Sequence, residues 1–242
     1  MKLCSPHYLP VSPSHFSILA LALFVIVAVI ELRALRYAYL RMSLGSRGAL
    51  LVLIGSLVGS YFNIPLVELP ARQILTREEI PVFGMSYVVP VAVDWPGTLI
   101  AINVGGAAIP ILVSLYLLAT HRLWARGAIA VASVTAVCHL LACPVPGLGI
   151  AMPALVPPVT AAVVALVLSR AEAAPLAYVC GSLGALAGAD LLNLDKVQDM
   201  GAPVASIGGA GTFDGVFLTG VLAVLLASLF PAPPQRHRSS QN

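Results

Sequence analysis

Charged residues are scarce in this chain of 242 residues, since Asp, Glu, Lys and Arg together make up 10% of it while 59% is hydrophobic. A soluble globular domain carries about 25% charged residues, so the composition excludes an ordinary soluble protein. The mean hydropathy of +0.96 is far above the range of soluble domains. The sequence therefore predicts an integral membrane protein.

Cysteine is scarce as well. The four cysteines, Cys4, Cys138, Cys143 and Cys180, form no C-x-x-C pair and show no regular spacing. Cys138, His139 and Cys143 lie close together in the sequence, but cysteine is often buried for packing reasons alone. The pattern is therefore a poor match to a zinc site. We predict no bound metal, and the sequence indicates no cofactor.

Apolar runs long enough to cross about 30 Å of hydrocarbon as helices of about 20 residues recur along the chain. They predict an all-α fold: a polytopic transmembrane bundle of about seven helices that forms a single domain over residues 1–242. The predicted helices cover residues 16–32, 48–66, 97–118, 127–143, 149–169, 174–194 and 208–230.

The distribution of basic residues predicts the orientation, because cytoplasmic loops carry an excess of Lys and Arg. One side holds nine Lys and Arg residues, in the 33–47 loop, the two short turns and the tail, and the other side holds four together with six acids. The N-terminal tail (1–15) is then outside, and the C-terminal tail (231–242) is cytoplasmic. The first helix is expected to stay as an uncleaved anchor. The net charge of +3 needs no nucleic-acid partner.

Two long connections lie on the outer side. The 67–96 loop ends in "VFGMSYVVPVAVDWPG" (82–97), whose β-branched and aromatic residues favour a strand or hairpin. The second, 195–211, contains Pro203 and several glycines, which disfavour a regular helix. Irregular backbone at membrane depth is tolerated where protein or trapped water satisfies it, so a re-entrant segment is a candidate here.

Two aspartates are predicted at one depth in the outer leaflet. At 1.5 Å per residue, Asp190 in the sixth helix and Asp214 in the seventh each lie about 6 Å inside the outer boundary. Intramembrane charges usually face the bundle interior or a wet cavity. We therefore predict an outer polar pocket. The other polar or helix-breaking residues near that depth are Asn63, Asn103, His139, Asn193 and the prolines of "MPALVPP" (152–158).

Structural roles compete with functional ones for each of these residues. Asparagines near helix ends often cap backbone groups, and His139 alone is more often a satisfied core residue than a catalyst. Asp214 could cap the start of the seventh helix, whereas Asp190 lies at an unfavourable C-terminal end. Small residues at helical spacing in "GSLGALAGAD" (181–190) favour close helix packing.

Four segments carry a resemblance to a known family. "TLIAINVGGAAIPILVSLYLL" (98–118), "IAMPALVPP" (150–158), "GADLLNL" (188–194) and "GAPVASIGGAGTFDGVFLTG" (201–220) resemble an uncharacterised family of prokaryotic multi-pass membrane proteins, a domain of unknown function. The likeness extends from about Gly48 to Phe230. It implies the cytoplasmic (inner) membrane of a prokaryote as the location, and it implies no activity.

A weaker similarity is to the intramembrane aspartyl proteases of the presenilin and signal-peptide-peptidase group. Pro153, Ala154 and Leu155 spell the P-A-L motif of that group, and Gly209, Gly211 and Asp214 form a stretched G-x-G-x-x-D. In that group the P-A-L motif follows the aspartates, whereas here it precedes them. The resemblance implies Asp190 and Asp214 as the catalytic pair.

Three functions remain open. In a hydrolase, Asp190 and Asp214 would share a proton and cleave a transmembrane peptide, with Asn103 and His139 positioning water and Gly208 to Gly211 admitting the substrate backbone.

In a transporter or ion-binding protein, broken backbone near Pro153 and around Gly208 to Thr212 would hold an ion or solute together with Asp190, Asn193, Asn103 and Asp214. The third function is a non-enzymatic sensor or scaffold. Membrane lipid is the one partner common to all three, and the oligomeric state stays open.

Overall fold

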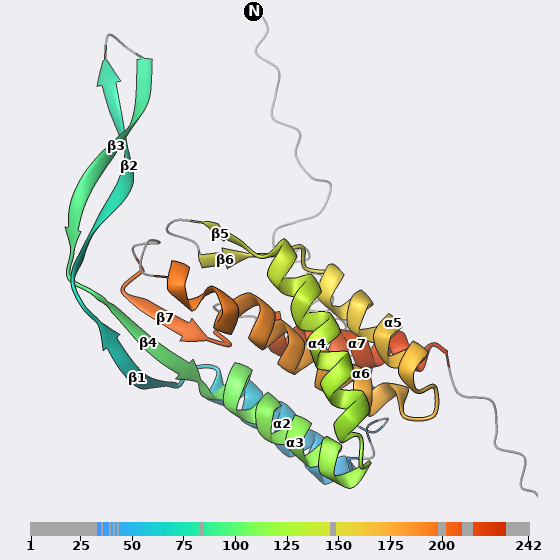
Figure 1. Ribbon diagram of the computed structural model, residues 1–242. Coiled ribbons are helices and arrows are strands. Elements are labelled where there is room, and N and C mark those ends of the chain that lie inside the picture. The colour runs from blue at the N-terminus through green and yellow to red at the C-terminus, as the bar shows by residue number, and fades with distance from the viewer. Residues whose placement is uncertain are drawn as a thin grey trace, which may run out of the picture.

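The computed structural model describes residues 33–34, 36–38, 40, 42, 44–82, 85–145, 149–197, 202–209 and 215–230. The described chain is mostly helical, with a small sheet at one end of the helices (Figure 1). The α-helices are α2 (Ser46–Gly59), α3 (Ile109–Thr120), α4 (Trp124–Leu141), α5 (Val156–Leu168), α6 (Ala173–Ala185) and α7 (Gly215–Ser228). Two π-turns and one 3-10 helix flank them: η1 (Val104–Ala108) leads into α3, and η2 (Leu186–Asp190) and η3 (Leu191–Lys196) follow α6.

The sheet has three strands in the order β1 (Asn63–Leu69), β4 (Thr98–Asn103) and β7 (Val204–Ile207). The first pair is antiparallel and the second is parallel. A separate hairpin of β2 (Arg72–Val82) and β3 (Met85–Trp95) extends away from the helices (Figure 1), and a short one joins β5 (Cys143–Val145) to β6 (Gly149–Ala151). The sheet brings chain segments about 140 residues apart together, since Ser206 Oγ donates a hydrogen bond to Asn63 Oδ1 over a separation of 143 residues.

Helix α6 is the centre of the helical core, because it packs against α3, α4, α5 and α7. Glycines in α6 and in η2 permit the close approach to α4: an added Cβ at Gly184 of α6 would lie 2.7 Å from Val134, and one at Gly188 of η2 would lie 2.5 Å from the Thr135 carbonyl oxygen. Gly181 faces Ala161 of α5 and Gly220 of α7. The predicted use of small residues for tight helix packing is therefore confirmed.

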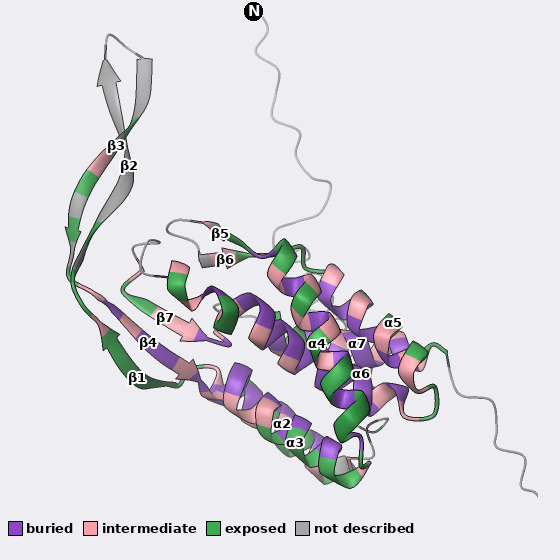
Figure 2. Cartoon of the chain, in the orientation of Figure 1, coloured by how far each residue is buried: buried purple, intermediate pink, exposed green. Residues whose placement is uncertain are grey.

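The helices carry apolar side chains on their exposed faces as well as on their buried ones. Figure 2 shows how exposed and buried residues alternate along the helices. On α5, Val159, Val163 and Val167 are exposed at four-residue spacing, while Ala161 and Ala165 face the core. Helix α2 likewise exposes leucine and isoleucine side chains along its length. Helices that are apolar all round are typical of a membrane span or of the core of a large protein.

Among the described residues, two helical segments are long and apolar enough to cross a membrane by length and composition: α4 with 18 residues, and the continuous run Ala173–Lys196 with 24. The remaining apolar helices of the described chain are shorter, Arg47–Gly59, Val104–Thr120, Val156–Leu168 and Gly215–Ser228. The prediction of about seven helices of spanning length is therefore supported only in part. The predicted helix 16–32 and the tails 1–15 and 231–242 lie outside the described residues.

Three predicted helix boundaries are wrong, and the fold is not purely all-α. The helix predicted over 48–66 ends at Gly59 and gives way to β1, the one predicted over 97–118 begins as strand β4, and the one predicted over 149–169 begins as β6. Apolar, β-branched segments such as "TLIAIN" (98–103) raise the hydropathy of a window as much as a helix does. Hydropathy alone does not separate a buried strand from a helix.

The structure agrees with the predictions for the described parts of the two long loops. The expected strand or hairpin near residues 82–97 is confirmed, and it is longer than expected because β2 and β3 pair in register from Arg72–Trp95 to Val82–Met85. In the second loop the regular helix is absent from the described part, as predicted, since residues 204–207 form β7. Whether this segment re-enters a membrane stays a prediction.

Candidate functional site

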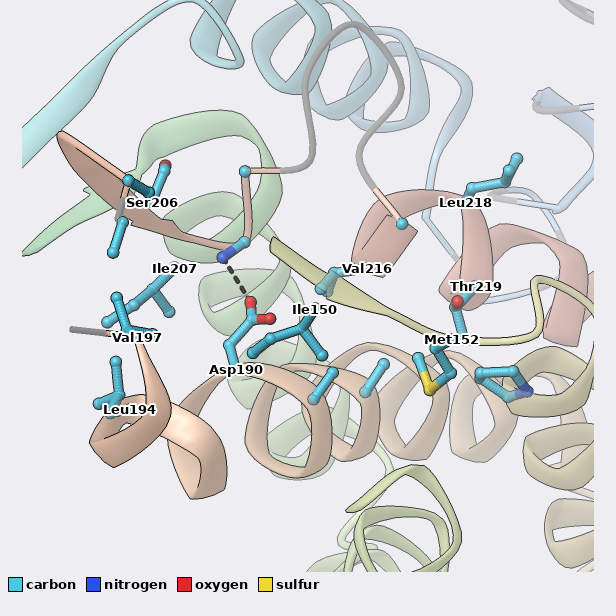
Figure 3. Close-up of a pocket in the computed structure, with 18 of the residues that line it drawn as sticks. Ile150, Met152, Asp190, Leu194, Val197, Ser206, Ile207, Val216, Leu218 and Thr219 are labelled. Atoms are coloured by element: carbon cyan, nitrogen blue, oxygen red, sulfur yellow. Dashed lines mark hydrogen bonds between the residues drawn. The ribbon is translucent and has the colours of Figure 1, made fainter. Parts of the chain in front are cut away.

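A cavity of about 520 Å³ lies at the sheet end of the helices, between the start of α5, the end of α6 with η2 and η3, strand β7 and the start of α7. Such a volume is within the range of small-molecule sites, about 300 to 1,000 Å³. Most of the described wall is apolar, and its polar side chains are Asp190, Ser206 and Thr219 (Figure 3). The larger apolar side chains of the wall are Ile150, Met152, Leu194, Ile207, Val216 and Leu218.

Asp190 is the one acidic side chain among the described residues that line the cavity, and its position comes from the irregular turn that follows α6. It is the last residue of the π-turn η2, which joins α6 to the 3-10 helix η3. Single π-turns inside α-helices are rare and often occur at functional sites. Asp190 is half-buried, and its carboxylate points toward the turn that follows β7.

One oxygen of the Asp190 carboxylate is held in place. Asp190 Oδ2 accepts a hydrogen bond from the backbone N–H of Gly208 at 2.7 Å, shown as the dashed line in Figure 3. The other oxygen, Oδ1, accepts no hydrogen bond from the described part of the chain and lies on the side of Ile150 and Val216 (Figure 3). The carboxylate is thus oriented at one oxygen and available to the cavity at the other.

Gly208 can donate this hydrogen bond because of its backbone conformation. Its φ of +74° lies in the left-handed region that favours glycine. An added Cβ would lie 2.7 Å from Ala107 Cβ and from the Gly106 carbonyl carbon, so η1 packs directly against the turn. The small residues of η1 and the glycine of the turn therefore both contribute to the position of Asp190.

Asn103 has a structural role in this arrangement. It is 3% exposed, its Oδ1 accepts from Gly106 N at 2.8 Å, and its Nδ2 donates to Ser60 O at 2.8 Å and to Asn63 Oδ1 at 3.1 Å. Ser206 Oγ also donates to Asn63 Oδ1, at 2.6 Å. The network caps η1 and joins β1, β4 and β7, and Asn103 is not among the residues that line the cavity.

Asn193 and His139 form a separate cluster. Asn193 is fully buried, and its Nδ2 donates to Gly188 O and Ala189 O at 3.0 Å each, while Lys196 Nζ donates to Asn193 Oδ1 at 2.7 Å. His139 Nδ1 lies 3.5 Å from Asn193 Nδ2. These contacts stabilise the irregular end of α6. Within the described ranges, no group of three or more His, Cys, Asp or Glu side chains could hold a metal ion.

The structure brings some of the site residues predicted from the sequence together around the cavity and places others away from it. Ala154, Gly208 and Gly209 line the cavity with Asp190, whereas Pro153 and Leu155 are exposed and do not line it. Gly211, Thr212 and Asp214 lie outside the described residues, so the pairing of Asp190 with Asp214 stays a prediction. The sequence reasoning missed Ile150, Met152, Ser206, Val216 and Thr219, whose residue types carry no signal of a site.

A family model with the description "Protein of unknown function (DUF1614)" matches residues 57–226, from the last turn of α2 into α7. The match covers more than half of the chain. The chain belongs to this family. No curated protein and no solved structure matches the chain. Membership supports the resemblance to a family of unknown function, and it assigns no activity to the cavity.

The hydrogen bond from Gly208 N predicts a difference between two substitutions in this member of the family. Asp190→Asn keeps an acceptor oxygen, whereas Asp190→Ala leaves a buried N–H without a partner, which costs about 1–3 kcal/mol. We expect the Ala variant to be less stable than the Asn variant by that amount in equilibrium unfolding by SDS in mixed micelles. The matched pair Asp195→Asn and Asp195→Ala, at an exposed position, should differ by less than about 0.5 kcal/mol. Equal stability of the two Asp190 variants would show that the bond contributes nothing.

Proposed function

We propose that this chain is an integral membrane protein whose helices lie in the bilayer. The proposal is supported by the apolar side chains that the helices present outward, among them Leu51 at 73% exposure, Leu140 at 81% and Val167 at 79%. Soluble monomers rarely expose such continuous apolar surface. In a bilayer the same side chains contact acyl chains.

The two ends of the helical bundle differ in charge. Exposed arginines gather at the end opposite the sheet, namely Arg47 at the start of α2 and Arg122, Arg126 and Arg170 at the turns. These turns are joined, because His121 Nδ1 lies 2.8 Å from Glu172 Oε2 and Arg126 Nη1 donates to Ser169 Oγ. The sheet end exposes Glu68, Asp94 and Asp195. By the excess of basic residues on the cytoplasmic side, the arginine end is cytoplasmic and the cavity faces outward.

Cysteine accessibility tests this orientation. Cys143 is an exposed free cysteine in β5 at the sheet end, so a membrane-impermeant maleimide should label it from outside in right-side-out vesicles of a Cys4→Ser background. Ala171→Cys, at an exposed position of the turn between α5 and α6, is the control in a background that also carries Cys143→Ser, and it should react only after permeabilisation. The opposite pattern would reverse the orientation, and labelling of both sites from outside would contradict membrane insertion.

The cavity beside Asp190 is the site that the geometry favours for function: a pocket that binds a small, mainly apolar molecule. The observation that carries this proposal is the combination of about 520 Å³ of apolar-lined space with one oriented carboxylate. Small-molecule sites usually combine apolar walls with a few fixed polar groups. A binding or sensing role needs only such a cavity and a fixed polar group, and the described residues supply both.

Photolabelling tests this role. A neutral phenyl-diazirine alcohol, applied to the protein in phosphatidylcholine nanodiscs, should label cavity residues such as Met152 and Val216 in a saturable manner. Ala154→Trp places a large side chain at the cavity wall and should reduce that labelling by at least five-fold. Ala151→Trp, at an exposed position that does not line the cavity, should leave it unchanged. If Met152 and Val216 label no more than the outward-facing Val163, the cavity is not a binding site.

Aspartyl hydrolysis is a second candidate for the same cavity. One observation favours it: Gly215 lines the cavity together with Asp190, and Asp214 directly precedes Gly215 in the sequence. Two neighbouring carboxylates would share one proton, so that one acts as general acid while the other activates water.

For this second candidate, Asp190→Asn and Asp214→Asn should each abolish cleavage of a transmembrane peptide library by the reconstituted protein. The neutral diazirine probe should still label both variants, because an amide replaces a carboxyl of the same shape. Cleavage that survives in either variant would exclude the shared-proton mechanism, and it would leave the binding role intact.

A further inference from the structure

The charge of Asp190 has no counter-ion within the chain as described. The carboxylate accepts one hydrogen bond, from Gly208 N, and no basic side chain of the described residues forms an ion pair with it. Lys196 is six residues further along, and its Nζ donates to Asn193 Oδ1 instead, at 2.7 Å. A carboxylate in an apolar environment is costly unless it is paired or protonated.

The unpaired oxygen of Asp190 faces the space that a ligand would fill. Oδ1 lies on the side of Ile150 and Val216, within a cavity whose other large side chains include Met152 and Leu218 (Figure 3). A bound cation on a compact apolar skeleton satisfies both features at once. Its charged group would donate to Oδ1 as a charge-assisted hydrogen bond of about 2.7–2.9 Å, and its skeleton would contact the apolar wall.

We propose that the ligand of this cavity is an organic cation, a protonated amine on a small apolar body, and that Asp190 is the residue that selects it. The inference rests on the proposed binding role of the cavity. A bare divalent metal ion fits less well, because such ions need several oxygen ligands and the described part of the chain offers no group of three candidate side chains. The surrounding apolar wall also favours an organic skeleton.

The selectivity follows from the pairing of charges. An amine gains an ion pair with Asp190, a matched alcohol gains only a neutral hydrogen bond, and a matched carboxylic acid meets a like charge. Hydrogen bonds to charged groups are roughly twice as strong as neutral ones. The amine should therefore bind at least ten-fold more tightly than the alcohol, and the acid should bind more weakly than both.

The experiment compares three phenyl-diazirine probes that share one skeleton and end in a primary amine, an alcohol or a carboxylic acid. Each is applied to the full-length protein in zwitterionic phosphatidylcholine nanodiscs at neutral pH, and labelling of Met152 and Val216 is measured against probe concentration. In the unmodified protein we expect half-saturation by the amine at a concentration at least ten-fold lower than by the alcohol. In Asp190→Asn the preference should fall to less than two-fold, while Asp195→Asn should keep it.

The outcomes separate the two proposals. Labelling by the alcohol in Asp190→Asn shows that the variant is folded and that its cavity is intact, so a lost amine preference then reports on the charge alone. Equal half-saturation of the unmodified protein by amine and alcohol would overturn the cation proposal and leave the binding role standing, with Asp190 protonated. Failure of all three probes to label the cavity above the level of Val163 would overturn both.

Discussion

The hydrogen bond from Gly208 N to Asp190 Oδ2 joins the two parts of the described fold, because it links the irregular end of α6 to the turn that follows β7. Strand β7 is paired in parallel with β4, and β4 continues directly into η1 and α3. The position of the carboxylate therefore depends on contacts from both the helical core and the sheet. The cavity exists at this junction, where a regular helix and a regular strand both end.

Two π-turns make that junction irregular, and each has a polar residue at its boundary. Asn103 caps η1 and connects it to β1 and β7, whereas Asp190 ends η2 and reaches the turn at Gly208. Both π-turns contain small residues, and these permit the backbone of η1 to contact Gly208 and that of η2 to contact α4. In a protein with apolar side chains on both faces of its helices, such irregular points are where polar groups gather.

Much of the fold follows from sequence patterns that depend on local composition. The centres of the helices around α4, α5 and α6, the strand or hairpin near residues 82–97 and the close packing at Gly184 and Gly188 are all recognisable from hydropathy, β-propensity and small-residue spacing. The strands β1 and β4 are not, because the aliphatic residues of "NIPLVEL" and "TLIAIN" continue the apolar runs of the helices beside them. Their strand conformation depends on pairing with each other and with β7, which follows β4 by about 100 residues.

The sequence by itself determined the apolar character of the helices, the positions of the basic residues along the chain and the choice of Asp190 as a candidate site residue, because these depend on residue type and position along one chain. Only the tertiary structure decided which polar residues share a site. Asn103, Asn193 and His139 lie at a depth similar to that of Asp190 in a simple helical projection. Asn103 and Asn193 nevertheless bind backbone groups elsewhere, and His139 contacts the Asn193 side chain, while Met152, Ser206 and Thr219 join Asp190 around the cavity. Depth is a property of one helix, whereas a cavity wall depends on how several segments rotate and end against one another.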